Sequence, residues 1–365
     1  MQKAKKRLFS VTAVLLAVLV ALTALLPTAG AAQAATMRSK YTGKSYTHNA
    51  RFNKLEVLNG VDISAWQEKV NWKKIKNDGI DFAILRAGYG KNASQEDAYF
   101  ATNFKNATAA GLPVGIYWYS YAKSVADVEK EARLCLQVLG SRTLDLPVFY
   151  DLEESSQLNK GKAFCTQLVE HFCSIIAAAG HTPGLYMSRS PLLDYIEQET
   201  RGRYALWVAE YGSKTCKYDG DYLMWQYADN GKVAGVNGHT DMDFLYGNKN
   251  SLPGSATLLK SKTYTGKAIT PAPTVTGEDG QPLKADKDYT LTYINNKAVG
   301  MATITAQGLG AYTGRRWYYR FKILPAKVTG LTLESRSKTR LTYIWNATHG
   351  ANAYLIQQFF APSAN

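Results

Sequence analysis

Cysteine is scarce in this chain, and the spacing of the few cysteines excludes a common class of metal site. Only four cysteines occur among 365 residues, and no two of them form the C-x-x-C pair that is typical of structural zinc sites. We therefore interpret them as buried core thiols, which behave as small apolar side chains. A disulfide stays open as an alternative, because the spacing does not define a pair. The four are Cys135, Cys165, Cys173 and Cys216.

Long apolar runs are absent beyond the N-terminus. The run over residues 8–26 follows a cluster of Lys and Arg at residues 3–7 and precedes Ala32-Gln33-Ala34. This order is typical of a secretory signal with an A-x-A cleavage site. We therefore predict a cleaved signal peptide over residues 1–35 and a secreted protein without a membrane segment after cleavage. Because the run is long enough to cross a bilayer, an uncleaved anchor is the alternative.

Acidic residues are scarce toward the C-terminus. Residues 258–365 hold 14 Lys and Arg against 5 Asp and Glu, and so carry most of the net charge of +14. A basic tail attracts polyanions over a long range. In a secreted protein these are expected to be anionic polymers of the cell envelope rather than nucleic acid. The alternative is an ordinary solvated surface.

Strand and helix patterns alternate from about residue 57 to residue 247. Alternation over this length predicts an α/β fold, either a parallel barrel or a doubly wound sheet, and eight strands favour the barrel. In a barrel the active site lies at the C-terminal ends of the strands. The expected strands cover residues 58–63, 82–87, 114–121, 147–152, 183–188, 206–209, 223–227 and 241–246, and the expected helices cover 96–110, 125–139 and 162–179.

The chain outside the barrel divides into three further segments. Residues 36–56 read as a polar lead-in, and the barrel domain is predicted over 57–250. Residues 258–325 are rich in Thr, Tyr, Gly and Lys with period-two alternation, which predicts a small all-β module. Residues 326–365 contain three strand-like runs, the last at 353–358, which are too few to close a sandwich.

Acidic residues gather where the expected barrel strands end. Asp151 and Glu153 follow an apolar strand and share one face, because side chains alternate along a strand. Two close carboxyls push their pKa values apart, so one can keep a proton and act as an acid. Asp62 ends the first strand, and Asp241 and Asp243 lie in the last strand, which a closed barrel returns beside the first. Acids are therefore expected at one mouth of the barrel from three strands.

Aromatic residues occur at the same strand ends. Sugar rings bind by stacking on aromatic side chains while polar groups orient their hydroxyls. Core packing is the competing interpretation for each aromatic residue taken singly. The candidate substrate-binding residues are Tyr117, Tyr119, Tyr186, Trp207, Trp225, Gln226 and Asp243.

Five segments, in order and spacing, resemble glycoside hydrolase family 25, the Chalaropsis-type lysozymes. They are 60–67 (GVDISAWQ), 110–117 (AGLPVGIY), 149–153 (FYDLE), 223–227 (LMWQY) and 241–247 (DMDFLYG). The resemblance implies an irregular TIM-like (β/α) barrel. It further implies N-acetylmuramidase activity, which is cleavage of the β-1,4 bond between N-acetylmuramic acid and N-acetylglucosamine in peptidoglycan. No metal and no organic cofactor are implied.

The resemblance also implies roles for the acidic residues. Glu153 would be the general acid, and Asp151 would assist the 2-acetamido group of the substrate, which serves as nucleophile with retention of configuration. Asp62 and Asp241 would line the same catalytic cleft. Two positions depart from the family pattern: residues 86–90 read RAGYG where Lys and a Ser/Thr-Glu-Gly segment are frequent, and Asp243 stands where Asn is frequent.

The C-terminal segments resemble modules of secreted bacterial proteins. Residues 260–323 are similar to a bacterial Ig-like repeat, and residues 326–360 are similar to the start of a fibronectin type III domain. The whole is interpreted as a monomeric, cell-wall-associated enzyme. Two alternatives stay open: a non-catalytic glycan-binding or adhesive protein on the same barrel, and a chitinase-like glycosidase, whose D-x-x-D-x-D-x-E signature is absent from residues 144–153.

Overall fold

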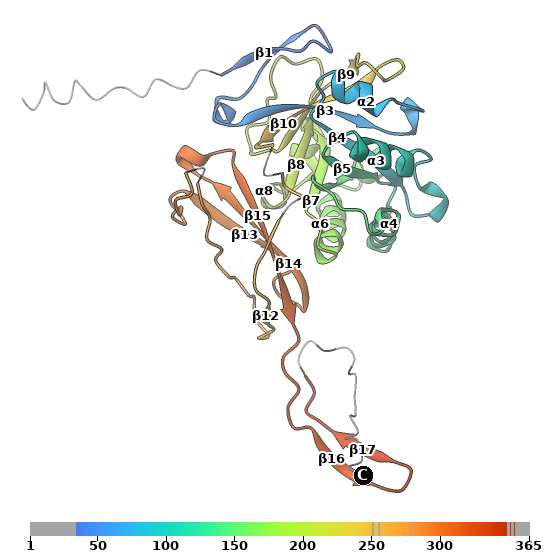
Figure 1. Ribbon diagram of the computed structural model, residues 1–365, viewed down its shortest axis with the longest axis vertical. Coiled ribbons are helices and arrows are strands. Elements are labelled where there is room, and N and C mark those ends of the chain that lie inside the picture. The colour runs from blue at the N-terminus through green and yellow to red at the C-terminus, as the bar shows by residue number, and fades with distance from the viewer. Residues whose placement is uncertain are drawn as a thin grey trace, which may run out of the picture.

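The computed structural model describes residues 34–249, 252–254, 256–277, 279–348, 351 and 354. Nearly all of the expected signal peptide, and most of the expected strand at 353–358, lie outside these residues. Figure 1 shows a rounded α/β unit, a β module beside it and a hairpin that extends away from both. Within the described ranges, no helix combines the length and the apolar character needed to cross a membrane.

The α/β unit is a closed barrel of eight strands, as the sequence predicts. The order around the barrel is β10-β3-β4-β5-β6-β7-β8-β9. Each strand overlaps one of the eight predicted ranges. The strands are β3 (Glu56–Ile63), β4 (Phe82–Tyr89), β5 (Val114–Tyr119), β6 (Val148–Asp151), β7 (Pro183–Ser188), β8 (Ala205–Ala209), β9 (Met224–Gly231) and β10 (Thr240–Gly247).

The barrel is not parallel throughout, which corrects one expectation. Strands β3 to β9 run parallel, but β10 is antiparallel to both of its neighbours. Only residues 232–239 connect β9 to β10, and a crossover to a parallel strand needs a dozen residues or more. The start of β10 therefore lies at the same mouth as the ends of the other strands, and Asp241 pairs in register with Asp62.

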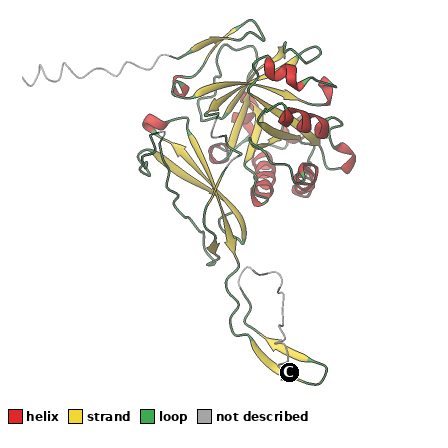
Figure 2. Ribbon diagram, in the orientation of Figure 1, coloured by secondary structure: helices red, strands yellow, loops and turns green. Residues whose placement is uncertain are grey.

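Helices cover the outside of the barrel (Figure 2). The predicted helix at 125–139 forms with those bounds, and the short helices of four to seven residues were not predicted because they span too few turns to show a period. All four cysteines are free and buried, as interpreted from the sequence. The helices are α2 (Trp72–Asn77), α3 (Phe100–Ala109), α4 (Val125–Leu139), α5 (Ser155–Leu158), α6 (Lys162–Ala178), α7 (Arg189–Tyr195) and α8 (Gln198–Arg203), with 3-10 turns η1 (Ala50–Phe52), η2 (Ala65–Gln67), η3 (Ala93–Gln95) and η4 (Gly310–Tyr312).

The lead-in segment is part of the core, contrary to the expectation of a polar approach. It forms a hairpin of β1 (Thr36–Arg38) and β2 (Ser45–Thr47). Tyr46 and Phe52 are buried against aromatic rings of the closing barrel strands, with the Phe52 ring stacked 3.9 Å from the ring of Tyr246. Single aromatic residues without a period give no signal in a sequence, which is why this packing was missed.

The barrel interior has an apolar floor. Inward side chains from alternate positions fill it, because successive residues of a strand face opposite sides. A Cβ at Gly60 would lie 2.1 Å from the ring of Phe82, so a glycine is needed there to admit the ring. Above this floor the inward side chains become polar. The floor is formed by Leu58, Phe82, Ile84, Phe149, Ala205, Met224 and Leu245.

A separate all-β module follows the barrel, as predicted. Its described strands form one sheet with its own apolar cluster around Ile304 and Phe321. A second hairpin, β16 (Thr332–Arg336) with β17 (Leu341–Ile344), extends beyond it (Figure 1). The Ig-like and fibronectin assignments stay predictions. The strands of the module are β11 (Thr257–Leu258), β12 (Lys262–Thr263), β13 (Tyr289–Ile294), β14 (Gly300–Gly308) and β15 (Arg316–Leu324).

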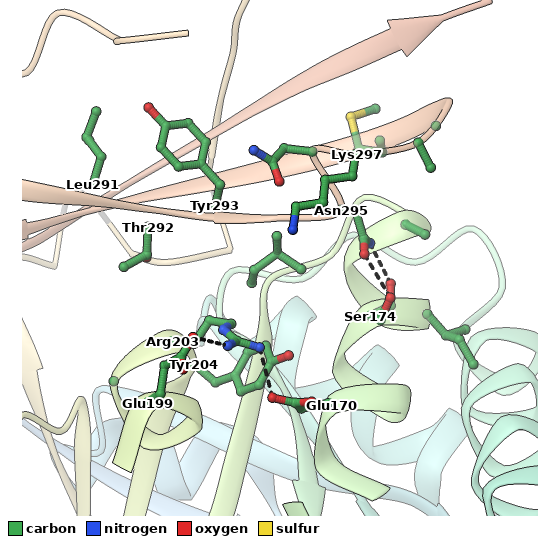
Figure 3. A pocket seen from close by; sticks show the side chains of 18 of the residues that line it. Glu170, Ser174, Glu199, Arg203, Tyr204, Leu291, Thr292, Tyr293, Asn295 and Lys297 are labelled. Carbon is green, nitrogen blue, oxygen red and sulfur yellow. Dashed lines mark hydrogen bonds and ion pairs between the residues drawn. The ribbon is translucent and has the colours of Figure 1, made fainter. Parts of the chain in front are cut away.

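The β module contacts the barrel at the end opposite the mouth. Arg316 of β15 pairs with Asp221, in the loop before β9, at 2.5 Å, and both side chains are largely buried. On the other side of the module, Asn295 exchanges two hydrogen bonds with Ser174 of α6 (Figure 3). A cavity of about 950 Å³ lies beside this contact, and its acidic side chains are paired with Arg203. This cavity therefore offers no free carboxyl pair.

We expect Asp221→Asn to destabilise the chain by about 2 kcal/mol, because it leaves the buried Arg316 guanidinium without its counter-charge. Urea unfolding followed by tryptophan fluorescence measures the change. Asp219→Asn, an exposed acid in the same loop, is the matched control and should have little effect. Equal stability of the Asp221 variant and the control would show that this ion pair does not stabilise the contact between the module and the barrel.

Candidate active site

Five acidic side chains meet at one mouth of the barrel. Asp62 lies near the end of β3, Asp151 ends β6, and Asp241 and Asp243 lie at the start of β10. Glu153 follows β6 by two residues and is exposed at the rim, whereas Asp62, Asp151 and Asp243 are buried. The structure thus brings together the acids that the sequence placed at strand ends.

A hydrogen-bond network holds Asp62 in place. Gln226 of β9 donates from Nε2 to Asp62 Oδ2 at 2.7 Å. The Oε1 atom of Gln226 accepts from the hydroxyl of Tyr186 at 2.6 Å and also from the hydroxyl of Tyr211. Because both tyrosine hydroxyls donate to Oε1, the amide of Gln226 can only turn its NH₂ toward Asp62. Gln226 is therefore fixed from two strands as the donor to this carboxyl.

Asp243 completes the group on the other side of Asp62. Trp207 Nε1 donates to Asp243 Oδ1 at 2.7 Å. Among the described residues, no N–H or O–H donor reaches Asp243 Oδ2, which leaves the carboxyl of Asp62 as its hydrogen-bonding neighbour. Burial, followed by the neighbouring acids, raises the pKa of both carboxyls well above the ordinary value. A proton held between Asp62 and Asp243 satisfies both.

Burial also raises the pKa of Asp241, to about 6, with a further contribution from the charge of Asp229. Asp241 lies directly opposite Asp62 in the β3–β10 register. Asp241 consequently loses its proton at a higher pH than an exposed aspartate does. The negative charge of this part of the mouth therefore increases between about pH 4 and neutrality.

We expect Asp243→Asn to raise the melting temperature at pH 7 by a few degrees. A carboxyl with a raised pKa in the folded state binds more protons than it does in the unfolded state, so it lowers stability as the pH rises above about 4. Asparagine keeps Oδ1 for Trp207 and offers an N–H to Asp62 without a charge. Calorimetry at pH 4 and pH 7 should show the larger gain at pH 7, and Asp194→Asn, at an exposed position of α7, serves as control. A lower melting temperature at pH 7 contradicts the prediction.

Asp151 and Glu153 form the second acidic group. Asp151 is buried and its Oδ1 atom accepts from no N–H or O–H group of the described residues. Burial, and then the charge and hydrogen bond of Glu153, raise the pKa of Asp151 well above the ordinary value. Desolvation also raises the pKa of Glu153, while its hydrogen bond with Asp151 acts in the opposite direction. The pair therefore holds a proton to a higher pH than ordinary carboxyls do, as two close acids can by sharing one.

Two residues that the sequence did not assign to the site support Asp151. Arg86 of β4 lies on the inward face, and its positive charge acts to lower the pKa of Asp151. Its Nε atom donates to Asp97 Oδ2 at 2.8 Å, and the side chain of Asp97 is fully buried. The inward position of Arg86 follows from its two-residue spacing to the floor residues Phe82 and Ile84. No sequence signal marks Asp97 as its partner.

The predicted aromatic residues divide between the two faces of the barrel wall. Tyr117, Tyr186 and Trp207 face the interior, and Tyr119 donates to Glu154 at 2.7 Å near the mouth. Trp207 is buried beneath Asp243, so it supports that carboxyl rather than exposing a ring.

Trp225 faces away from the mouth, which corrects its assignment as a substrate-binding residue. It is fully buried outside the barrel, where it donates to the carbonyl of Glu210 and packs on Tyr46 and Phe244. Its neighbour Gln226 faces inward, and adjacent residues of a strand cannot both do so.

Exposed aromatic rings surround the mouth instead. Trp66, in η2 directly after β3, is 83% exposed, Tyr121 after β5 is 46% exposed and Tyr211 after β8 is 42% exposed. Exposed rings beside a polar cleft are the surfaces on which sugar rings stack. Trp66 belongs to the motif at 60–67, but the exposure of a motif residue cannot be read from its sequence.

Comparison with known proteins finds relatives of the barrel domain. The profile described as "Glycosyl hydrolases family 25" matches residues 61–236. The protein described as "Uncharacterized protein YegX" of Escherichia coli O157:H7 is 30% identical over 206 residues, covering 54% of this chain and 72% of that protein. "Lysozyme M1" of Streptomyces globisporus is 26% identical over 208 residues, covering 52% of this chain and 68% of that protein.

A solved structure of the bacterial lysozyme from Streptomyces coelicolor is also similar, with 23% identity, a TM-score of 0.46, and coverage of 52% of this chain and 93% of that chain. The family match includes Asp62, Asp151 and Glu153. The chain belongs to glycosyl hydrolases family 25, and it is a glycoside hydrolase of the lysozyme, or muramidase, class.

Proposed function

We propose that the chain cleaves the β-1,4 bond between N-acetylmuramic acid and N-acetylglucosamine in peptidoglycan, with retention of configuration. The observation that carries this proposal is the pairing of the buried Asp151 with Glu153 at the rim of the same barrel mouth, where burial raises the pKa of both carboxyls. One member of the pair is buried and the other is exposed at the rim, so the two carboxyls can take different roles.

Glu153 is proposed as the general acid. Its raised pKa keeps a proton on the pair to a higher pH than an ordinary glutamate would, as a general acid requires. Its position at the rim allows its carboxyl to reach the oxygen of a glycan laid across the mouth. Glu153 gives its proton to the leaving O4 atom as the C1–O4 bond breaks, and later takes a proton from the attacking water.

Asp151 is proposed to assist the 2-acetamido group of the substrate. Its Oδ1 atom lacks a donor, and the N–H of the acetamido group would supply one. Once that N–H donates to Asp151, the shared proton is free to reside on Glu153. The acetamido oxygen then attacks C1, and the carboxylate of Asp151 stabilises the positive charge that develops on the ring nitrogen of the cyclic intermediate. Water opens this intermediate and restores the original configuration.

The remaining acids are proposed to line the cleft. Asp62 is held by Gln226, and together with Asp241 it gives the mouth a negative potential that favours a positively charged transition state. The buried and hydrogen-bonded setting of these acids favours an enzyme over a non-catalytic glycan-binding protein, because buried carboxyls without a role are costly. The reaction requires no cofactor.

We propose that the enzyme acts outside the cell as a monomer associated with the wall. The signal-like segment at 1–35 and the basic tail, with 14 Lys and Arg against 5 Asp and Glu over residues 258–365, support this. The tail is proposed to bind anionic wall polymers. Retention of the full chain on purified walls should fall as salt is raised from 50 to 500 mM, because the attraction is electrostatic. Retention that ignores salt contradicts this role of the tail.

The proposed bond and stereochemistry can be tested on the products. Digestion of purified peptidoglycan should give new reducing ends on muramic acid, identified by borohydride reduction and mass spectrometry. Proton NMR of the first products of a soluble glycan should show the β-anomer before mutarotation. Reducing ends on glucosamine would contradict the proposed bond, and an initial α-anomer would contradict retention.

A further inference from the structure

Arg86 is a fixed cation at the catalytic mouth. Its Nε atom donates to Asp97 Oδ2 at 2.8 Å, and only 14% of the side chain is exposed. Asp97 in turn accepts from the backbone N–H groups of Ala65, at 2.8 Å, and Tyr99, at 3.0 Å. Because three segments converge on this one carboxylate, the direction of the guanidinium is determined by the fold.

The two terminal nitrogen atoms of the Arg86 guanidinium, which form its outer fork, have no partner among the described residues. Among the described residues, its Nη1 and Nη2 atoms make no hydrogen bond and no ion pair, since the one contact of the guanidinium is through Nε. Arg86 pairs in register with Tyr117, whose side chain faces the interior. It also follows the inward residues Phe82 and Ile84 at two-residue spacing, so it faces the cleft. A largely buried guanidinium with two free parallel donors fits a carboxylate, which it can bind through two hydrogen bonds.

An aromatic wall borders this fork. The Arg86 Cζ atom lies 5.6 Å from the ring centre of Tyr89. The rings of Tyr89 and Tyr121 meet edge to face at 6.2 Å, and those of Tyr121 and Tyr119 lie 5.1 Å apart. Tyrosine rings offer the apolar faces on which a sugar can stack. A cation beside this group of tyrosine rings indicates a ligand that is both a sugar and an acid.

We propose that Arg86, with the wall of Tyr89 and Tyr121, forms a subsite for a carboxylate carried by the muramic acid residue of the substrate. Muramic acid differs from glucosamine by a lactyl ether, which ends in a carboxyl group. In peptide-free glycan this carboxylate is free, whereas in intact peptidoglycan it is amide-linked to a stem peptide that carries carboxylates of its own. The inference rests on the proposed function, because it assigns the muramic side of the cleaved bond to this part of the mouth.

Three soluble glycans of equal length test the proposal on the unmodified enzyme. One is peptide-free with the lactyl carboxylates intact, the second has them converted to neutral N-methylamides, and the third carries stem peptides. We expect kcat/KM for at least one acidic glycan to exceed that for the neutral glycan by about 10-fold or more, mainly through a lower KM. The neutral glycan lacks the carboxylate and so cannot form the charge-assisted bidentate hydrogen bonds with Arg86. A preference for the peptide-free glycan identifies the lactyl carboxylate, and a preference for the third glycan alone identifies a stem-peptide carboxylate.

Variants assign the preference to Arg86. Because the charge of Arg86 also acts on Asp151, Arg86→Gln should lower the rate on every glycan, but it should lower it more on the acidic glycans and so abolish their advantage over the neutral glycan. Arg86→Lys should keep part of that advantage because it retains the charge without the fork. Arg189 is the matched control, since it is also a partly buried arginine paired through Nε, to Glu210 after β8. Arg189→Gln should keep the difference.

Equal rates of the wild-type enzyme on all three glycans would contradict the proposed subsite. Loss of the preference for acidic glycans in the Arg189 variant alone would contradict it as well. The proposed subsite is also contradicted if Arg86→Gln lowers kcat/KM by the same factor on acidic and neutral glycans, because Arg86 would then act only through Asp151. These outcomes are distinct from failure of the proposed function, in which none of the glycans is cleaved between muramic acid and glucosamine.

Discussion

Glu153→Gln is expected to lower kcat/KM on peptidoglycan by about 10²–10⁴-fold, which is the usual contribution of a general acid. Glutamine keeps the size and the hydrogen-bonding oxygen of the side chain but has no proton to give to the leaving oxygen. Because Glu153 lies exposed at the rim, the substitution should leave the melting temperature nearly unchanged. Release of muramic acid reducing ends, measured at several glycan concentrations, gives the loss.

The neighbouring acid provides a matched control. Glu154 carries the same charge one residue later, but its Oε1 atom accepts from the hydroxyl of Tyr119 and faces another partner. Glu154→Gln should therefore cost far less activity than Glu153→Gln. Comparable losses in the two variants would show that the negative charge of the loop matters, rather than proton donation by Glu153.

The pH dependence of the wild-type enzyme follows from the same pair. The raised pKa values of Asp151 and Glu153 mean that the pair keeps its one proton to a higher pH than ordinary carboxyls do. We expect kcat/KM to fall on the alkaline side as Glu153 loses its proton, and on the acidic side as the pair takes up a second one. The alkaline decline should be absent from the residual activity of Glu153→Gln.

Much of the site could be predicted because a strand has only two faces. Once Asp151 and Glu153 were placed beyond an apolar strand, and Asp62 at the end of another, the barrel rule brought them to one mouth. The same rule excludes one of Trp225 and Gln226, which are adjacent in β9. Only one of two adjacent residues can face the cleft, and the structure assigns that position to Gln226.

Other features depend on contacts that no local pattern records. The direction of β10 is determined by the short connection from β9, residues 232–239. The pairing of Arg86 with Asp97 and the packing of Phe52 on Tyr246 join residues whose partners are determined by the closed barrel. Periodicity predicts which residues of one element share a face, but it does not predict which residues of different elements meet.

Asp151→Asn is expected to lower kcat by about 10²–10³-fold, the range found when one group that stabilises developing charge is removed. Asparagine can still accept the acetamido N–H, but it carries no negative charge to balance the positive cyclic intermediate. The substitution also removes a buried carboxyl with a raised pKa, so the melting temperature at neutral pH should not fall. Loss of rate without loss of stability separates a chemical role of Asp151 from a structural one.

The dependence of Asp151 on the acetamido group can be measured with a double cycle. A glycan whose sugar at the cleaved bond lacks the N-acetyl group should react far more slowly with the wild-type enzyme, because the nucleophile is missing. If Asp151 acts through that group, Asp151→Asn should add little further loss on this glycan, so the two changes should be strongly non-additive. Asp194→Asn, which removes an exposed acid from α7, should respond to both glycans as the wild-type enzyme does. Full additivity would instead indicate that Asp151 acts on the sugar directly, as a nucleophile of the two-carboxylate type.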